Sequence, residues 1–134
     1  MYLQELIKQL KILKMKIEVS NGEIVDKLTI LEIKADRIKD KEKLKNILAE
    51  LESLKKIFNE LNVDKKLYIY LLRVNYNLYD IENDIRDKEN NKEFDKRFIQ
   101  LARLIYTLND SRAKIKKQIN IETKSSFIEE KSYH

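Results

Sequence analysis

The near absence of helix-breaking residues is the feature that most limits how this chain folds. Its 134 residues contain no proline and a single glycine, Gly22. Because proline ends or kinks a helix and glycine weakens one, helices here are interrupted only where polar turn residues allow it. A chain of this length is expected to form one domain with a hydrophobic core that needs no metal or disulfide. We therefore predict an all-α fold.

Apolar residues recur at alternating spacings of three and four along four segments, as expected for amphipathic helices. The second segment has the most regular pattern, with Leu44, Ile47, Leu51, Leu54, Phe58 and Leu61. This alternation is typical of helices that pack nearly antiparallel to one another. The predicted helices cover residues 20–37, 41–61, 65–89 and 92–120. We predict that these four main helices form an antiparallel bundle.

The segments outside the bundle have different patterns. Residues 1–14 are expected to form a short helical extension that precedes the bundle domain, residues 15–120. Residues 15–20 alternate between apolar and polar side chains, which predicts a short extended segment before the first main helix. Residues 121–134 lose the helical period and are expected to be a non-helical tail. This tail either pairs as a short strand with residues 16–20 or is mobile.

The composition excludes several classes of function. The chain has no cysteine, which rules out thiol chemistry and iron–sulfur clusters and fits a reducing, cytoplasmic location. Lysines interrupt the apolar residues of the N-terminus, and no run is long enough to cross a bilayer. The net charge is +5, but the two signs alternate along every segment, which favours solvated helix faces over a nucleic-acid surface. The most basic stretch, residues 112–117, also suits a helix C-terminus.

The start of the first main helix carries a capping motif. Ser20 followed by Glu23 matches the capping box, in which each side chain accepts a hydrogen bond from a free backbone amide. We therefore expect Ser20 and Glu23 to act as a structural cap. Loss of such a cap costs on the order of 1 kcal/mol.

Several charged and amide side chains lie at, or next to, positions that the apolar pattern reserves for the core. Arg112 has the most unusual place, because it continues the apolar stripe of its helix. The candidate site residues are Lys27, Lys34, Glu82, Arg86, Glu89, Asn109, Arg112 and Lys116. A buried charge is costly unless it is paired, so these residues either form a closed salt-bridge network or hold a ligand. In this interpretation Asp26 lies on the flank of its helix, outside the cluster.

The functional hypotheses differ in what the cluster does. In one, the cations bind an anionic small molecule, such as a phosphate ester or a carboxylate, for which the planar guanidinium of arginine is well suited. In another, Glu23 and Asp26, with Glu82 and Asp84, hold Mg²⁺ for pyrophosphate hydrolysis; a site like that of chorismate mutase is a related possibility. In the third, the protein is an interaction or homo-oligomerisation module, and its cluster is purely structural. No cofactor is implied, and the single histidine, His134, supports no metal site.

Five sequence blocks together resemble a known family. They are MKIEVSNGEIVDKLTILEIK at residues 15–34, LYDIENDIR at 78–86, residues 98–106, NDSRAKIK at 109–116 and EKSY at 130–133. The chain resembles, over residues 15–133, short bacterial and phage proteins catalogued as a domain of unknown function. The resemblance implies no activity. It leaves residues 1–14 outside the family domain.

Overall fold

The computed structural model describes residues 3–4 and 15–132, and its main elements are four α-helices. They are α2 (Asn21–Arg37), α3 (Lys41–Leu61), α4 (Lys65–Asn90) and α5 (Lys96–Glu122). Within the described ranges no strand forms, so the predicted all-α helical bundle is confirmed. The helical extension predicted for residues 1–14 lies outside the described residues, except for residues 3–4.

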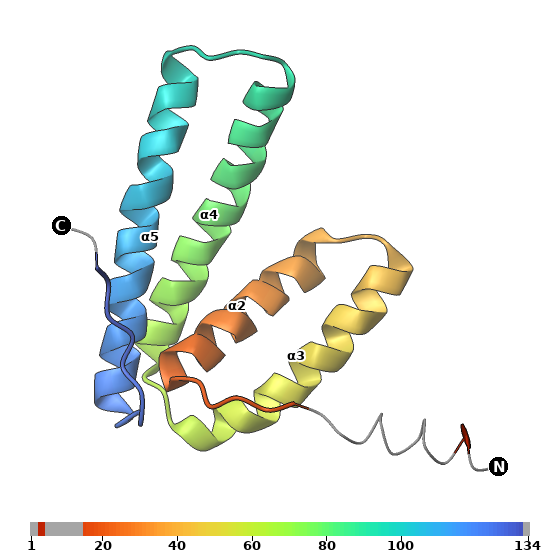
Figure 1. Ribbon diagram of the computed structural model, residues 1–134, viewed down its shortest axis with the longest axis vertical. Helices are drawn as coiled ribbons and strands as arrows, with labels where there is room; N and C mark the ends of the chain where they lie inside the picture. Colours follow the sequence, from red (N-terminus) through yellow and green to blue (C-terminus); the bar gives the residue numbers. More distant parts are fainter. Residues whose placement is uncertain (1–2, 5–14, 133–134) are drawn as a thin grey trace.

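The helices form two antiparallel hairpins, α2 with α3 and α4 with α5 (Figure 1). The first turns of α2 lie against the base of the second hairpin, where α4 begins and α5 ends (Figure 1). As a result α2 packs along the other three helices, whereas α3 packs mainly along α2. The outer halves of α4 and α5 extend beyond α2 (Figure 1).

Polar caps fix where the helices begin. Ser20 accepts a hydrogen bond from the amide of Glu23, and Asp40, Asp64 and Asp95 cap α3, α4 and α5 through their side chains in the same way. Asn62 ends α3 in the left-handed conformation, with φ 54°, which asparagine tolerates better than most residues. The helix bounds therefore follow from local signals in the sequence.

The ends of the second hairpin differ from the sequence prediction. The predicted helices end at residue 89 and begin again at residue 92, but α4 continues to Asn90 and the chain turns through residues 91–95. Helix α5 starts at Lys96, because Asp95 provides its cap, and it continues to Glu122. Residues 123–132 are non-helical, as predicted for the tail. They form no strand with residues 16–20 in the described chain and instead run back along α5 (Figure 1).

The core consists of two apolar clusters that share α2. One joins α2 to α3 through Leu28, Leu31, Ile47 and Leu51. The other joins α2 to α4 and α5 through Val25, Leu71 and Ile119. Phe58 and Tyr68 pack against both clusters, with their ring centroids 5.3 Å apart. Because α2 is covered on several sides, it buries Val25 and Ile33 in addition to Leu28 and Leu31.

No helix in the described part of the chain is long and apolar enough to span a membrane.

Candidate functional site

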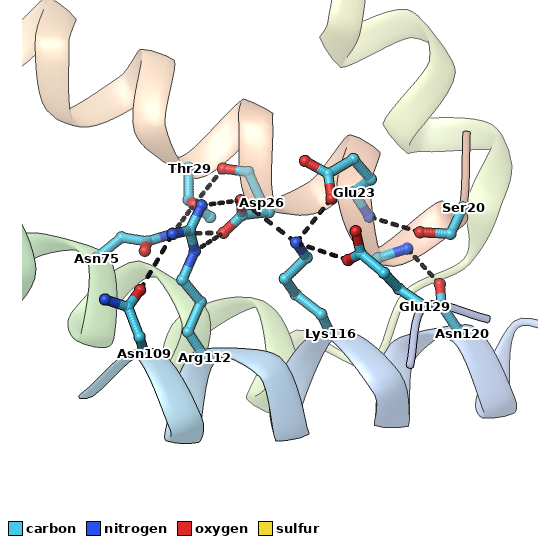
Figure 2. Close-up of polar contacts among 11 residues, drawn as sticks. Ser20, Glu23, Asp26, Thr29, Asn75, Asn109, Arg112, Lys116, Asn120 and Glu129 are labelled. Carbon is cyan, nitrogen blue, oxygen red and sulfur yellow. Dashed lines mark hydrogen bonds and ion pairs between the residues drawn. The ribbon is translucent and has the colours of Figure 1, made fainter. Parts of the chain in front are cut away.

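A buried carboxylate, that of Asp26, lies at the centre of the polar cluster where α2 crosses α4 and α5 (Figure 2). Only 1 % of Asp26 is exposed. Arg112 on α5 donates two hydrogen bonds to it, from Nε to Oδ1 at 2.8 Å and from Nη2 to Oδ2 at 2.5 Å. This two-point geometry is the strongest arrangement available to an arginine and a carboxylate. It also raises the pKa of Arg112 further, although burial alone would lower it.

Helix α4 contributes an amide to the same carboxylate. Asn75 is 5 % exposed, and its Nδ2 donates to Asp26 Oδ1 at 2.9 Å and to Thr29 Oγ1 at 2.8 Å. The Thr29 hydroxyl donates in turn to the backbone carbonyl of Asp26 at 2.7 Å. One amide on α4 thus holds two neighbouring polar groups of α2, one turn apart.

Lys116 extends the cluster from α5 toward the tail. Its Nζ lies 2.6 Å from Glu23 Oε2, 3.3 Å from Glu129 Oε2 and 3.9 Å from Asp26 Oδ2. Burial lowers the pKa of Lys116, but the hydrogen bond to Glu23 and the charges of Asp26, Glu23 and Glu129 outweigh burial and raise the pKa above its ordinary value of 10.5. The ammonium is therefore held in its charged form by three carboxylates.

The single glycine allows the start of α2 to approach α5 closely. The Gly22 amide donates to Asn120 Oδ1 at 2.6 Å. A Cβ at this position would lie 2.5 Å from the Lys116 carbonyl oxygen, closer than real Cβ atoms approach. Asn21 adds hydrogen bonds to Ser125 and Thr123, just after α5. Any larger residue at position 22 would push the two helices apart.

The structure brings together some of the predicted site residues. Arg112 and Lys116 bind Asp26 and Glu23, and Asn109 Oδ1 accepts from Arg112 Nη1 at 3.4 Å. Glu82 is half-buried and close enough to help raise the pKa of Arg112.

Other predicted residues lie outside the cluster. Lys27 is exposed and pairs with Glu50 on α3 at 2.8 Å. Lys34, Arg86 and Glu89 are exposed on α2 and α4. The capping residues also have separate roles: Ser20 caps α2, whereas the Glu23 side chain binds Lys116.

The charged cluster predicted from the sequence omitted its central residue, Asp26, which was named only in the Mg²⁺ hypothesis. Asp26 was placed on the flank of its helix, and this was wrong: the apolar stripe was assigned to one face, whereas α2 is covered on several sides. Thr29, Asn75 and Glu129 were also left out. The available signals were weak: Asp26 and Thr29 lie one turn apart in an apolar stretch, and Asn75 lies beside the apolar seam of its helix. The link from Asp26 to Arg112 spans 86 positions and leaves no local trace in the sequence.

The cluster is closed. Among the described residues every buried side-chain nitrogen or oxygen has a hydrogen-bond partner. Three carboxylates, those of Glu23, Asp26 and Glu129, face the two cations Arg112 and Lys116, so the local charge is negative. An anion that approached the Asp26–Arg112 pair would meet this net negative charge, and the Asp26 carboxylate is already held by three hydrogen bonds. In the part of the chain that is described, no group of three or more His, Asp or Glu side chains is placed to hold a metal ion.

The fold and the cluster together define an all-helical bundle protein whose buried charges are paired with one another. The chain belongs to the family described as "Family of unknown function (DUF6165)", whose model matches residues 15–134. The expected membership of a family of unknown function is thus confirmed, while a bacterial or phage origin stays a prediction. Comparison with curated proteins and with solved structures found no match.

Proposed function

We propose that this protein is an interaction module that self-associates through the outer part of its α4–α5 hairpin. The charged cluster has a structural role in this proposal and locks α2 against α4, α5 and the tail. The closed pairing at the centre of the cluster supports that role, because each buried polar side-chain atom among the described residues has a partner. A cytoplasmic location stays a prediction from the composition.

The proposed contact surface is the arm, which we define as residues 80–106 of α4, α5 and their turn. Near the start of the arm, Arg37 at the end of α2 pairs with Asp80 at 3.3 Å. Beyond this point α4 and α5 extend as a hairpin past the end of α2 (Figure 1). A hairpin of two helices covers only one face of each helix, so the other faces are left open for a partner.

Four large apolar side chains of the arm are exposed. Phe94, Ile99, Leu104 and Tyr106 are between 38 % and 62 % exposed, whereas Leu101 is buried. Ile99 and Tyr106 lie seven positions apart and therefore share one face of α5. Apolar side chains gathered on one exposed surface commonly mark a protein contact. This apolar surface is the observation that carries the proposal.

The charges of the arm favour a second copy of this chain as the partner. Residues 80–90 carry five acidic and two basic side chains, a net charge of −3, whereas residues 96–106 carry three basic and no acidic ones, a net charge of +3. Asp80 pairs with Arg37, and Lys88 pairs with residues of the turn. Between the two described segments themselves no ion pair forms within one molecule, so their other charges are available to a second copy. A two-fold axis would place α4 of each copy against α5 of the other and match the opposite charges twice.

Sedimentation equilibrium of the full chain tests the proposal. We expect a monomer–dimer equilibrium at micromolar concentration that weakens as salt is added, because screening reduces attraction between exposed charges. Ile99→Gln should weaken the dimer about tenfold. Leu48→Gln is the matched control, since Leu48 on α3 is 48 % exposed and Ile99 is 52 % exposed. A monomer at high micromolar concentration in low salt would exclude the proposal.

Charge reversal identifies the partner as a second copy. The variant Arg97→Glu with Arg103→Glu makes the basic half of the arm acidic, and Asp84→Lys with Glu89→Lys makes the acidic half more basic. Each variant alone should be monomeric, because like charges would meet across the axis. An equimolar mixture should form heterodimers, because both α4–α5 contacts then join segments of opposite net charge. Two variants that dimerise alone as well as wild type would contradict the proposed arrangement.

A further inference from the structure

The tail of the chain is held against α5 by ion pairs. Glu129 pairs with Lys116 at 3.3 Å, and both carboxylate oxygens of Glu130 lie 3.0 Å from Lys117 Nζ. Lys131 pairs with Asp110 at 2.6 Å. Within the described chain no backbone hydrogen bond ties residues 126–132 to α5. Two of these pairs, Lys117–Glu130 and Lys131–Asp110, join exposed groups. Such pairs contribute little to stability and weaken in salt, so we expect this end of the tail to be easy to displace.

A cleft of about 790 Å³ lies between the tail and α5. This volume falls within the range of small-molecule binding sites. The apolar part of the cleft lining comes from Ile105, Tyr106 and Ala113. Asn109 and Asn120 also line the cleft. The lining thus combines apolar surface with a few polar groups, as in typical ligand sites.

Two cations of this cleft are occupied by consecutive carboxylates of the tail. Lys116 faces Glu129 and Lys117 faces Glu130, and each of these glutamate side chains is 69 % exposed. Tail carboxylates therefore stand where the anionic groups of a ligand would bind. Among the described residues, the Nδ2 atoms of Asn109 and Asn120 donate no hydrogen bond, so they are available as further donors to such a ligand.

We infer that this cleft binds a small molecule with two anionic groups, phosphate or carboxylate, which displaces Glu129 and Glu130 from Lys116 and Lys117. The Asp26–Arg112 pair stays closed in this proposal. Lys116 also keeps Glu23 at 2.6 Å, so it contributes less to the ligand than Lys117 does. The tail carboxylates thus compete with the ligand for these two lysines. This inference does not depend on self-association of the arm.

Calorimetric titration of the full chain tests the inference with three probes: inorganic pyrophosphate, succinate and inorganic phosphate. The variant Glu129→Gln with Glu130→Gln removes the competing charges and should bind the preferred two-group probe about tenfold more tightly than wild type does. Pyrophosphate binding without succinate binding would assign the site to phosphates, and the reverse would assign it to carboxylates. Inorganic phosphate that binds as tightly as pyrophosphate would overturn the requirement for two anionic groups.

A lysine substitution locates the site. In the Glu129→Gln, Glu130→Gln background, Lys117→Gln should weaken binding about tenfold, because one of the two cations is lost. Lys55→Gln on α3 is the matched control and should leave affinity unchanged. Lys117 is exposed and lies outside the buried cluster, so its variant is expected to fold, which circular dichroism verifies. The inference fails if the carboxamide variant binds neither two-group probe at millimolar concentration, or if Lys117→Gln and Lys55→Gln behave alike.

Discussion

The Asp26 carboxylate and the Arg112 guanidinium meet side by side across the α2–α5 interface, although 86 positions separate them in the chain. Asp26 is fully buried, while the Arg112 side chain is 28 % exposed at the cluster edge. A buried ion pair adds little net stability over an apolar pair, because both charges lose their hydration. The main effect of the pair is therefore on specificity. A packing of α2 on α5 that separated the two charges would leave each of them unpaired, so one register of the two helices is favoured.

Removal of the buried carboxylate should be strongly destabilising. Asp26→Asn keeps the shape of the side chain but leaves the Arg112 charge without its partner, and we expect a loss of about 3 kcal/mol in the free energy of unfolding. Urea denaturation measures this loss. Glu50→Gln is the control, because the Lys27–Glu50 pair is about half exposed and should contribute less than about 1 kcal/mol. Equal losses for the two variants would show that Asp26 is not the centre of the cluster.

Replacement of both partners should be less harmful than removal of one. In the double variant Asp26→Leu with Arg112→Met, no unpaired charge is left in the interface, so it should unfold at a higher urea concentration than Asp26→Asn does. The Asn75 amide then loses one acceptor but keeps Thr29. A double-mutant cycle built on Asp26→Leu and Arg112→Met measures the coupling. Additive losses would argue against direct coupling of the two side chains.

The glycine at position 22 should not tolerate even a methyl group. In Gly22→Ala the new Cβ meets the backbone carbonyl of Lys116, which cannot rotate away, so the helices must separate. We expect a loss of about 1–3 kcal/mol despite the better helix propensity of alanine. Thermal unfolding measures the loss. Ser53→Ala on the exposed side of α3 is the control, and a Gly22→Ala protein as stable as this control would contradict the close approach.

Alkaline pH should destabilise the fold. The Tyr68 hydroxyl donates a hydrogen bond to the Glu32 carboxylate, and burial, followed by this bond, raises the tyrosine pKa well above its ordinary value of 10.0. The pKa of Lys116 is raised as well. Both groups keep their protons longer in the folded state, so unfolding releases protons and stability falls as pH rises above the unfolded-state values.

Urea midpoints measured from neutral pH to above pH 10.5 test this dependence. Tyr68→Phe should flatten the alkaline decline, because the phenylalanine has no proton to lose. Tyr70→Phe, at a half-exposed tyrosine on the same helix, is the matched control. A decline of the same steepness in wild type and in Tyr68→Phe would exclude Tyr68 as a contributor.

Local signals determined much of the fold. The apolar seam of residues 44–61 predicted a helix over 41–61, which are the bounds of α3, because helix periodicity depends on neighbouring residues. Arg112 was also found from sequence, since it stands at a core position of its helix. The start of α5 was predicted at residue 92, four residues too early. The sequence signal for the true start at Lys96 is the capping side chain of Asp95, and the prediction did not use it.

Only the tertiary structure decided what the polar residues do. The sequence by itself determined four amphipathic helices and showed that Arg112 stands at a position that the apolar pattern reserves for the core. It did not determine that α2 packs against three helices, which buries Asp26 and makes it the partner of that arginine. Nor did it determine that Glu129 returns to Lys116 from the tail. The physical reason is that periodicity records the existence of an apolar face, whereas the pairing of charges depends on which distant segments meet there.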